Sequence, residues 1–117
     1  MMNMKPEAEQ DDILFETPNG YVKFMRYCNK LRVLYGNTIV EPTYHEFNKL
    51  QRMIRSLNQY VADVRHVNYR RFLIRSKQYH LSWALNSWEI KELYELLSGA
   101  KLMFQVKQIF NDSLNSK

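Results

Sequence analysis

Residues 43–64 constrain the fold of this chain more than any other segment. Their apolar residues recur at intervals of three and four, a spacing that places them on one face of an α-helix. These residues are Phe47, Leu50, Ile54, Leu57, Val61 and Val64. Thr43 stands at the N-cap position, and Glu46 follows three residues later, which is the pattern of a capping box. We therefore predict a helix that begins after Thr43 and buries this apolar face.

The start of this helix has a counterpart 43 residues later. Asn86 and Glu89 repeat the cap residue and its glutamate, again just ahead of an apolar helical pattern. Strand-like residues precede both helix starts, at 38–41 and at 79–85. Two explanations remain open: the chain contains two related β-β-α units, or the same helix-start chemistry arose twice independently.

Alternation of apolar and polar residues predicts antiparallel strands in the rest of the chain. The strands are expected at residues 13–15, 21–27, 31–35, 38–41, 69–75 and 79–85. The second helix runs over 87–98. Gly99 either ends it or is absorbed in a kink, and a third helix or a long extension of this helix follows. A helical period continues beyond it, in Leu102, Met103, Val106, Ile109 and Phe110. The fold class is α+β: one antiparallel sheet of five to six strands, with two or three helices packed on one face.

Composition sets the boundaries of the domain. A chain of 117 residues with 45% hydrophobic residues can bury one core without disulfides or metals. Residues 1–12 are polar and acidic, and we expect a disordered tail there, ahead of a single globular domain over residues 13–117. The tail lacks the apolar stretch of a secretory signal, and no apolar run has the length of a membrane span. We expect a cytoplasmic protein that does not enter a membrane.

Few residue patterns point to catalysis or to metal binding. His45 and Glu46 begin like the zinc-binding HExxH helix, but Lys49 stands where the second histidine is needed. The single cysteine, Cys28, excludes a disulfide within the chain and has no local signature of a nucleophile. With only three glycines, no phosphate-binding loop motif occurs. We expect no enzymatic activity, no metal and no cofactor.

The polar and apolar residues of the helices are expected on opposite sides. Three glutamates of the second helix are assigned to its solvated side: Glu89, Glu92 and Glu95. The apolar stripes of the helices are assigned to the core, including Met53, Met103 and Phe104.

Positive charge is concentrated in the middle of the chain. Residues 21–77 hold twelve lysines or arginines against three acids, whereas residues 1–20 are acidic and residues 78–117 are balanced. If the apolar side of the predicted sheet faces the helices, its opposite face gathers cations and aromatic rings. This basic face consists of Tyr21, Lys23, Arg32, Tyr69, Arg71, Arg75 and His80. Lysine and arginine bind phosphates and tyrosine rings stack on bases, so the face has the groups that single-stranded nucleic acid requires.

The basic face has two further interpretations. An antiparallel sheet commonly exposes one polar face to solvent without any function. Tyrosine and arginine are also frequent in protein interfaces, so the face suits a protein partner or a second copy of the chain. We interpret the protein as a non-enzymatic binding domain whose partner the sequence does not identify, with single-stranded nucleic acid as the alternative.

Several short motifs follow one another along the chain: Asn19-Gly20-Tyr21, Tyr27-Cys28, Thr43-x-x-Glu46-Phe47, Arg70-Arg71-Phe72-Leu73-Ile74, Leu81-Ser82-Trp83 and Glu89-Ile90-x-Glu92-Leu93. Their order over residues 13–110 resembles a family of small uncharacterised bacterial proteins. The resemblance implies a bacterial intracellular domain and no catalytic activity.

Overall fold

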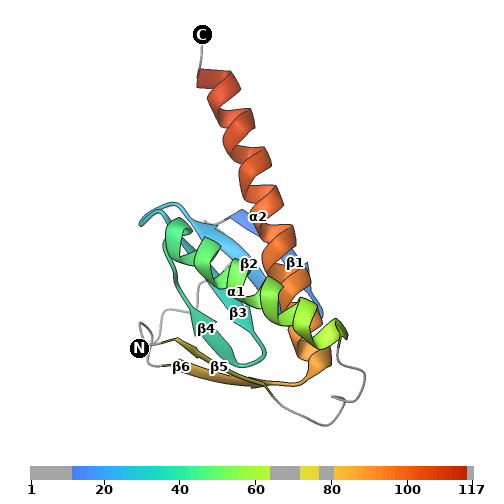
Figure 1. Cartoon of the computed structure of the whole chain (residues 1–117). Coiled ribbons are helices and arrows are strands. Elements are labelled where there is room, and N and C mark those ends of the chain that lie inside the picture. Colours follow the sequence, from blue (N-terminus) through green and yellow to red (C-terminus); the bar gives the residue numbers. More distant parts are fainter. Residues whose placement is uncertain (1–11, 64–71, 77–80, 116–117) are drawn as a thin grey trace, which may run out of the picture.

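The computed structural model describes residues 12–63, 72–76 and 81–115 (Figure 1). The elements are β1 (Asp12–Thr17), β2 (Gly20–Met25), β3 (Lys30–Tyr35), β4 (Thr38–Val40), α1 (Tyr44–Asp63), β5 (Phe72–Ser76), β6 (Leu81–Leu85) and α2 (Ser87–Asn115). Each predicted strand and both predicted helix starts match one of these elements, so the α+β class is confirmed. Of the predicted tail, residues 1–12, only Asp12 lies within the described residues, where it begins β1.

The described strands form two antiparallel sheets, so the prediction of one sheet of five to six strands is wrong. One sheet has the order β1-β2-β3-β4, and β5 pairs with β6 in the other. Strands joined by short turns pair readily with their sequence neighbours. The outer strand β4 has three residues and offers only a short edge to a further strand. Alternation of apolar and polar residues predicts the two faces of a strand but not the strand with which it pairs.

Both helices begin with the capping boxes that the sequence predicts. At α1, the Thr43 N–H donates to Glu46 Oε1 at 2.8 Å, and the Glu46 N–H donates to Thr43 Oγ1 at 3.2 Å. At α2, Asn86 and Glu89 exchange the equivalent two bonds, each at 2.9 Å. These bonds pair backbone N–H groups that the first turn of a helix cannot satisfy itself.

Helix α2 continues without interruption through Gly99, so the longer-helix alternative is correct. A Cβ atom at Gly99 would lie 2.6 Å from ring atoms of Phe15. Glycine therefore allows β1 to approach α2 closely at this point. The contact offsets the weak helix propensity of glycine, which costs about 1 kcal/mol relative to alanine.

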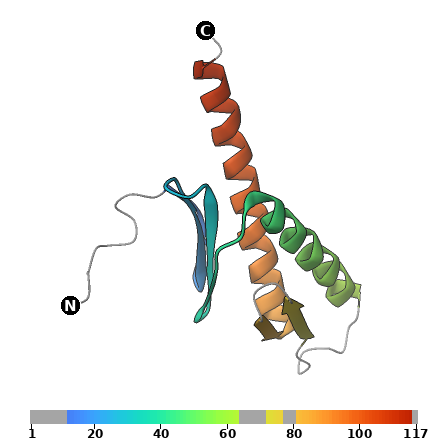
Figure 2. The same ribbon diagram turned by 90° about the vertical axis from the view of Figure 1, so that its left-hand side faces the viewer.

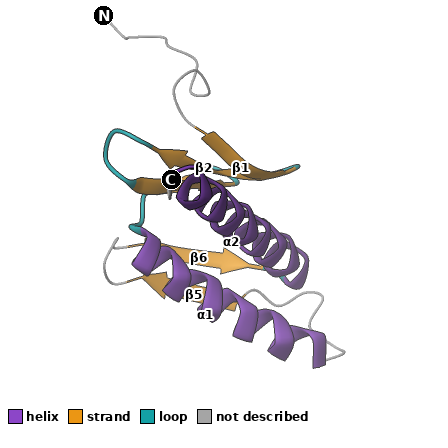
Figure 3. Cartoon of the chain, turned by 90° about the horizontal axis from the view of Figure 1, so that it is seen from above, coloured by secondary structure: helices purple, strands orange, loops and turns teal. Residues whose placement is uncertain are grey.

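Helix α2 is the central element of the molecule. It crosses one face of the four-stranded sheet, contacting β1 and β2, and α1 packs along its other side (Figures 2 and 3). One hydrophobic cluster joins these elements with the β5–β6 pair. The helical residues fully buried in it are Phe47, Ile54, Ile90, Leu93, Leu96, Leu97 and Ala100. The prediction that the helices pack on one face of a sheet therefore holds for the four-stranded sheet.

Two methionines assigned to the core lie on the surface instead. Met53 on α1 and Met103 on α2 are exposed, while Phe104 is partly buried against the core. The second half of α2 runs past the sheet and past α1 (Figure 2). Apolar periodicity predicted the helix correctly here, but the fold places no described element over its outer side. None of the described helices has the length and apolar content of a membrane span.

Candidate functional site

Three of the residues assigned to the basic face share the outer face of the four-stranded sheet. In the β2–β3 register, Lys23 lies opposite Arg32, and Tyr21 is two residues before Lys23 on the same face. Lys23 is only 2% exposed, with its Nζ 5.9 Å from the centre of the Tyr21 ring. The guanidinium of Arg32 is held by Glu41, with Nη2 at 2.6 Å and Nε at 2.7 Å from Glu41 Oε2. Neither cation projects openly from this face.

The remaining residues of the predicted basic face do not extend this surface. Arg75 is exposed, but it lies on β5, in the separate two-stranded sheet. Tyr69, Arg71 and His80 lie outside the described residues. The prediction that one sheet face gathers Arg75 with Arg32 is wrong, because β5 does not pair with the four-stranded sheet.

Glu92 is buried, although the sequence pattern assigned it to the solvated side of α2. The residue is 8% exposed, and its carboxylate faces the β1–β2 turn. Oε2 accepts the Asn19 N–H at 3.0 Å, and Oε1 accepts the Asn19 side-chain amide at 2.8 Å. The Tyr35 hydroxyl lies 3.1 Å from Oε1 and 3.2 Å from the Glu89 carbonyl oxygen. One signal was present in the sequence: Glu92, Leu96 and Gly99 share a helical stripe. In the structure this stripe faces β1, β2 and the turn between them.

These bonds set the ionisation of the Glu92 and Tyr35 side chains. Burial raises the pKa of Glu92, but the hydrogen bonds donated by Asn19 and Tyr35 outweigh it and hold the pKa below its ordinary value. Burial, with the negative charge of Glu92 beside it, raises the pKa of the Tyr35 hydroxyl. Glu92 is therefore ionised at neutral pH and anchors the β1–β2 turn to α2.

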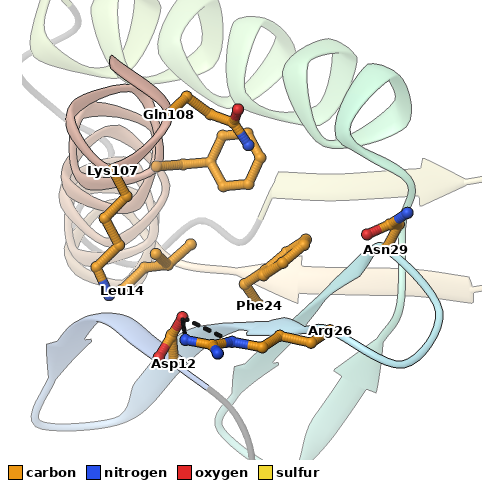
Figure 4. Close-up of a pocket in the computed structure, with 8 residues that line it drawn as sticks. Asp12, Leu14, Phe24, Arg26, Asn29, Lys107 and Gln108 are labelled. Atoms are coloured by element: carbon orange, nitrogen blue, oxygen red, sulfur yellow. Dashed lines mark hydrogen bonds and ion pairs between the residues drawn. The ribbon is translucent and has the colours of Figure 1, made fainter. Parts of the chain in front are cut away.

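A pocket of about 370 Å³ lies between the sheet and the second half of α2 (Figure 4). Its lining residues come from β1, β2, the β2–β3 turn and α2: Asp12, Leu14, Phe24, Arg26, Asn29, Phe104, Lys107 and Gln108. Leu14, Phe24 and Phe104 form its apolar wall, and the other five residues carry polar or charged groups. The volume lies within the range of about 300–1,000 Å³ typical of ligand pockets.

The charged groups of the pocket are unequally neutralised. Arg26 binds Asp12, with Nη2 at 2.8 Å and Nε at 3.3 Å from Asp12 Oδ2. Lys107 has no acidic partner among the described residues, and its side chain extends from α2 toward β1, the strand that carries both Leu14 and Asp12 (Figure 4). Among its described lining residues, the pocket thus combines one ion pair with one lysine that has no acidic partner.

Aromatic contacts hold the wall of the pocket in place. The Phe104 ring packs edge-to-face against Phe24, with 5.5 Å between centroids, and stacks on Tyr44 of α1 at 4.4 Å. Three elements therefore meet at Phe104, which limits its movement. A second hollow of about 390 Å³, lined by Tyr44, Phe104, Gln105 and Gln108, adjoins the same ring.

The residues weighed for catalysis or metal binding lie apart from this pocket. Cys28 is exposed in the β2–β3 turn, and His45 is exposed in the first turn of α1. Glu46 is engaged in its capping box. The described residues contain no cluster of three or more His, Cys, Asp or Glu side chains that could hold a metal ion.

Comparison with known proteins gives a single kind of match. The model of a family described as "Family of unknown function (DUF6686)" matches residues 7–113 of the chain. No curated protein and no solved structure matches the chain. The match confirms the resemblance to an uncharacterised family and assigns no activity.

Proposed function

The chain belongs to the DUF6686 family of unknown function, and we propose that it is a non-enzymatic binding domain that holds a small organic anion in the pocket of Figure 4. The observation that carries this proposal is the ammonium group of Lys107. It has no acidic partner in the described parts of the chain, and it stands beside an apolar wall. A cation in such a place attracts an anion that also has apolar surface to bury.

The lining residues define the chemistry of the ligand. A carboxylate would bind Lys107, and an apolar or aromatic body would lie against Phe24 and Phe104. The side-chain amides of Asn29 and Gln108 supply hydrogen bonds for polar groups between these two ends. Because Asp12 neutralises Arg26, the described lining residues carry one net positive charge, which suits a monocarboxylate better than a polyphosphate.

Binding is better supported than catalysis at this site. The one carboxylate among the described lining side chains, that of Asp12, is bound to Arg26 and is not available as a general base. The described lining residues include no serine, cysteine or histidine. The cytoplasmic setting expected from the sequence remains a prediction.

Single-stranded nucleic acid remains the alternative partner, with less support. Stacking and phosphate binding need exposed rings and open cations on one surface. Lys23 is buried, Arg32 is bound to Glu41, and Arg75 lies on the other sheet. The tests below therefore include an oligonucleotide.

The proposal is tested by titrating ¹⁵N-labelled protein with 3-phenylpropionate and with its neutral amide. We expect the carboxylate to shift backbone resonances around Phe24 and Phe104, and the amide to bind about tenfold more weakly or not at all, since a hydrogen bond to a charged group contributes about 1.5–3 kcal/mol. The Lys107→Met variant should bind the carboxylate probe more weakly than wild type by the same factor. Lys91→Met, an exposed lysine of α2 outside the pocket, should bind like the wild type. Equal affinity of Lys107→Met and wild type, or no shifts at millimolar probe, would refute the proposal.

A second arm measures fluorescence anisotropy of labelled single-stranded DNA and RNA at about 50 and 200 mM salt. The organic-anion proposal predicts no salt-dependent binding of either oligonucleotide. Binding that weakens steeply with salt, persists in Lys107→Met and is lost in Arg75→Ala would favour the alternative partner instead.

A further inference from the structure

The second half of α2 has an apolar outer side that the described chain leaves uncovered. Leu102 is 60% exposed, Val106 48% and Met103 37%. On the opposite side of the helix, Phe104 packs against Phe24 and Tyr44. Beyond this contact the helix continues past both the sheet and α1 (Figures 1 and 2). Apolar residues thus occur on two sides of this half, and the fold covers one of them.

The exposed residues form a stripe with the spacing of a helix–helix interface. Leu102 and Val106 are four residues apart and lie on the same side of α2, with Met103 beside them. Ile109 follows three positions later in the sequence, so the interval alternates between four and three, as it does along a coiled-coil seam. An isolated helix of about a dozen residues is marginal in water, so a partner along this stripe would stabilise the projecting half.

The stripe carries no charge along its length. The neighbouring lysines of this half, Lys101 and Lys107, are partly buried and project at other angles of the helix, and the flanking residue Gln105 is neutral. A strongly acidic or basic partner would need a complementary charged rim, which these residues do not provide. Two copies of a chain with formal net charge +5 can meet here without placing like charges face to face.

We propose that a second copy of this chain covers the stripe, with the two α2 helices antiparallel about a two-fold axis near Val106. The interface is then isologous, the same residues serving both chains. The antiparallel arrangement places the two four-stranded sheets at opposite ends of the helix pair, because each sheet lies beside the first half of its own α2 (Figure 2). Lys107 and the pocket lie away from the stripe, so dimerisation and ligand binding are separate properties.

The test is the oligomeric state in sedimentation equilibrium, from low micromolar to several hundred micromolar protein. We expect wild-type protein to have twice the mass of the chain at the upper concentrations. Val106→Glu should be monomeric, its dimer weakened at least about tenfold, because each interface would bury two carboxylates without partners. Gln108→Glu is the matched control: it introduces the same charge at an exposed position on the opposite side of α2 from Val106, and the variant should remain dimeric.

Two further measurements keep the outcome decisive. The near-UV circular dichroism spectrum of Val106→Glu should equal that of wild type, which would show that the variant is folded. Leu102→Glu, folded by the same criterion, should lose dimerisation as Val106→Glu does. Sedimentation with vesicles of phosphatidylglycerol and phosphatidylcholine examines a lipid surface as the alternative occupant. A wild-type chain that stays monomeric throughout, a folded Val106→Glu variant that still dimerises, or a monomer that moves onto vesicles through Leu102 would each overturn the proposal.

Discussion

The two halves of α2 have the same kind of sequence and opposite environments. In the first half, Ile90, Leu93 and Leu97 are fully buried between the sheet and α1. In the second half, Leu102 and Val106 are about half exposed or more. The apolar periodicity is similar in both, so burial here depends on the neighbours that the fold supplies. The first half holds the domain together, and the second exposes apolar side chains that the described chain does not cover.

The strongest test of this contrast is to truncate one leucine to alanine in each half of α2. Leu93→Ala should lower the free energy of unfolding by about 2–5 kcal/mol, because it opens a cavity in a fully buried cluster. Leu102→Ala should change it by about 0.5 kcal/mol or less, because that side chain is already in water. Urea unfolding measures both values, at a concentration low enough to keep the chain monomeric.

A comparable loss in the two variants would contradict the contrast between the halves. In that case the second half of α2 would be packed in the monomer as well. An unchanged urea m-value in both variants would show that each substitution alters stability without altering the denatured state.

The fold could be predicted up to the pairing of its strands. Helix starts depend on contacts within four residues, so Thr43 with Glu46 and Asn86 with Glu89 were sufficient to place them. Strand faces depend on alternation, which placed Val22 and Val33 in the core. The separation of β5 and β6 from the other strands depends on contacts distant in sequence, which no local pattern encodes.

The carboxylate of Glu92 provides the second, smaller test, because it anchors the first half of α2 to the β1–β2 turn. Glu92→Gln should cost about 1–3 kcal/mol at neutral pH, since the amide leaves donors of Asn19 or Tyr35 without a charged acceptor. The exposed Glu95, one turn later, gives the control Glu95→Gln, which should leave stability unchanged.

The pH dependence of the same variant sharpens the result. Because folding lowers the pKa of Glu92 below its ordinary value of 4.5, its contribution is fully present above that value. The contribution is lost as the pH falls through the lower, folded-state pKa. Wild-type stability should therefore decline on acidification below about pH 4.5, and the decline should be shallower in Glu92→Gln. Parallel acid profiles of the two proteins would show that Glu92 does not contribute.

The candidate site was less predictable than the fold. The sequence placed Tyr21, Lys23 and Arg32 on one strand face correctly, because alternation determines the face. It did not reveal that Lys23 is buried or that Glu41 binds Arg32, since both depend on the three-dimensional neighbours. The pocket was not foreseen at all, because residues far apart in the sequence, from strands and from the end of α2, meet only in the folded chain.

Removing the N-cap of α2 should give the smallest change in stability, and it compares the two halves of the helix by hydrogen exchange. Asn86→Ala removes the acceptor of the Glu89 N–H and should cost about 1 kcal/mol. Hydrogen exchange should accelerate in the first turn and stay unchanged beyond Gly99, where we expect the projecting half to exchange faster than the buried half in the wild type as well. Thr43→Ala, the same change at the α1 cap, should cost a similar amount and leave exchange in α2 unaltered. Uniform acceleration along all of α2 in Asn86→Ala would mean that the helix opens as a single unit, and the two halves would then differ in exposure but not in stability.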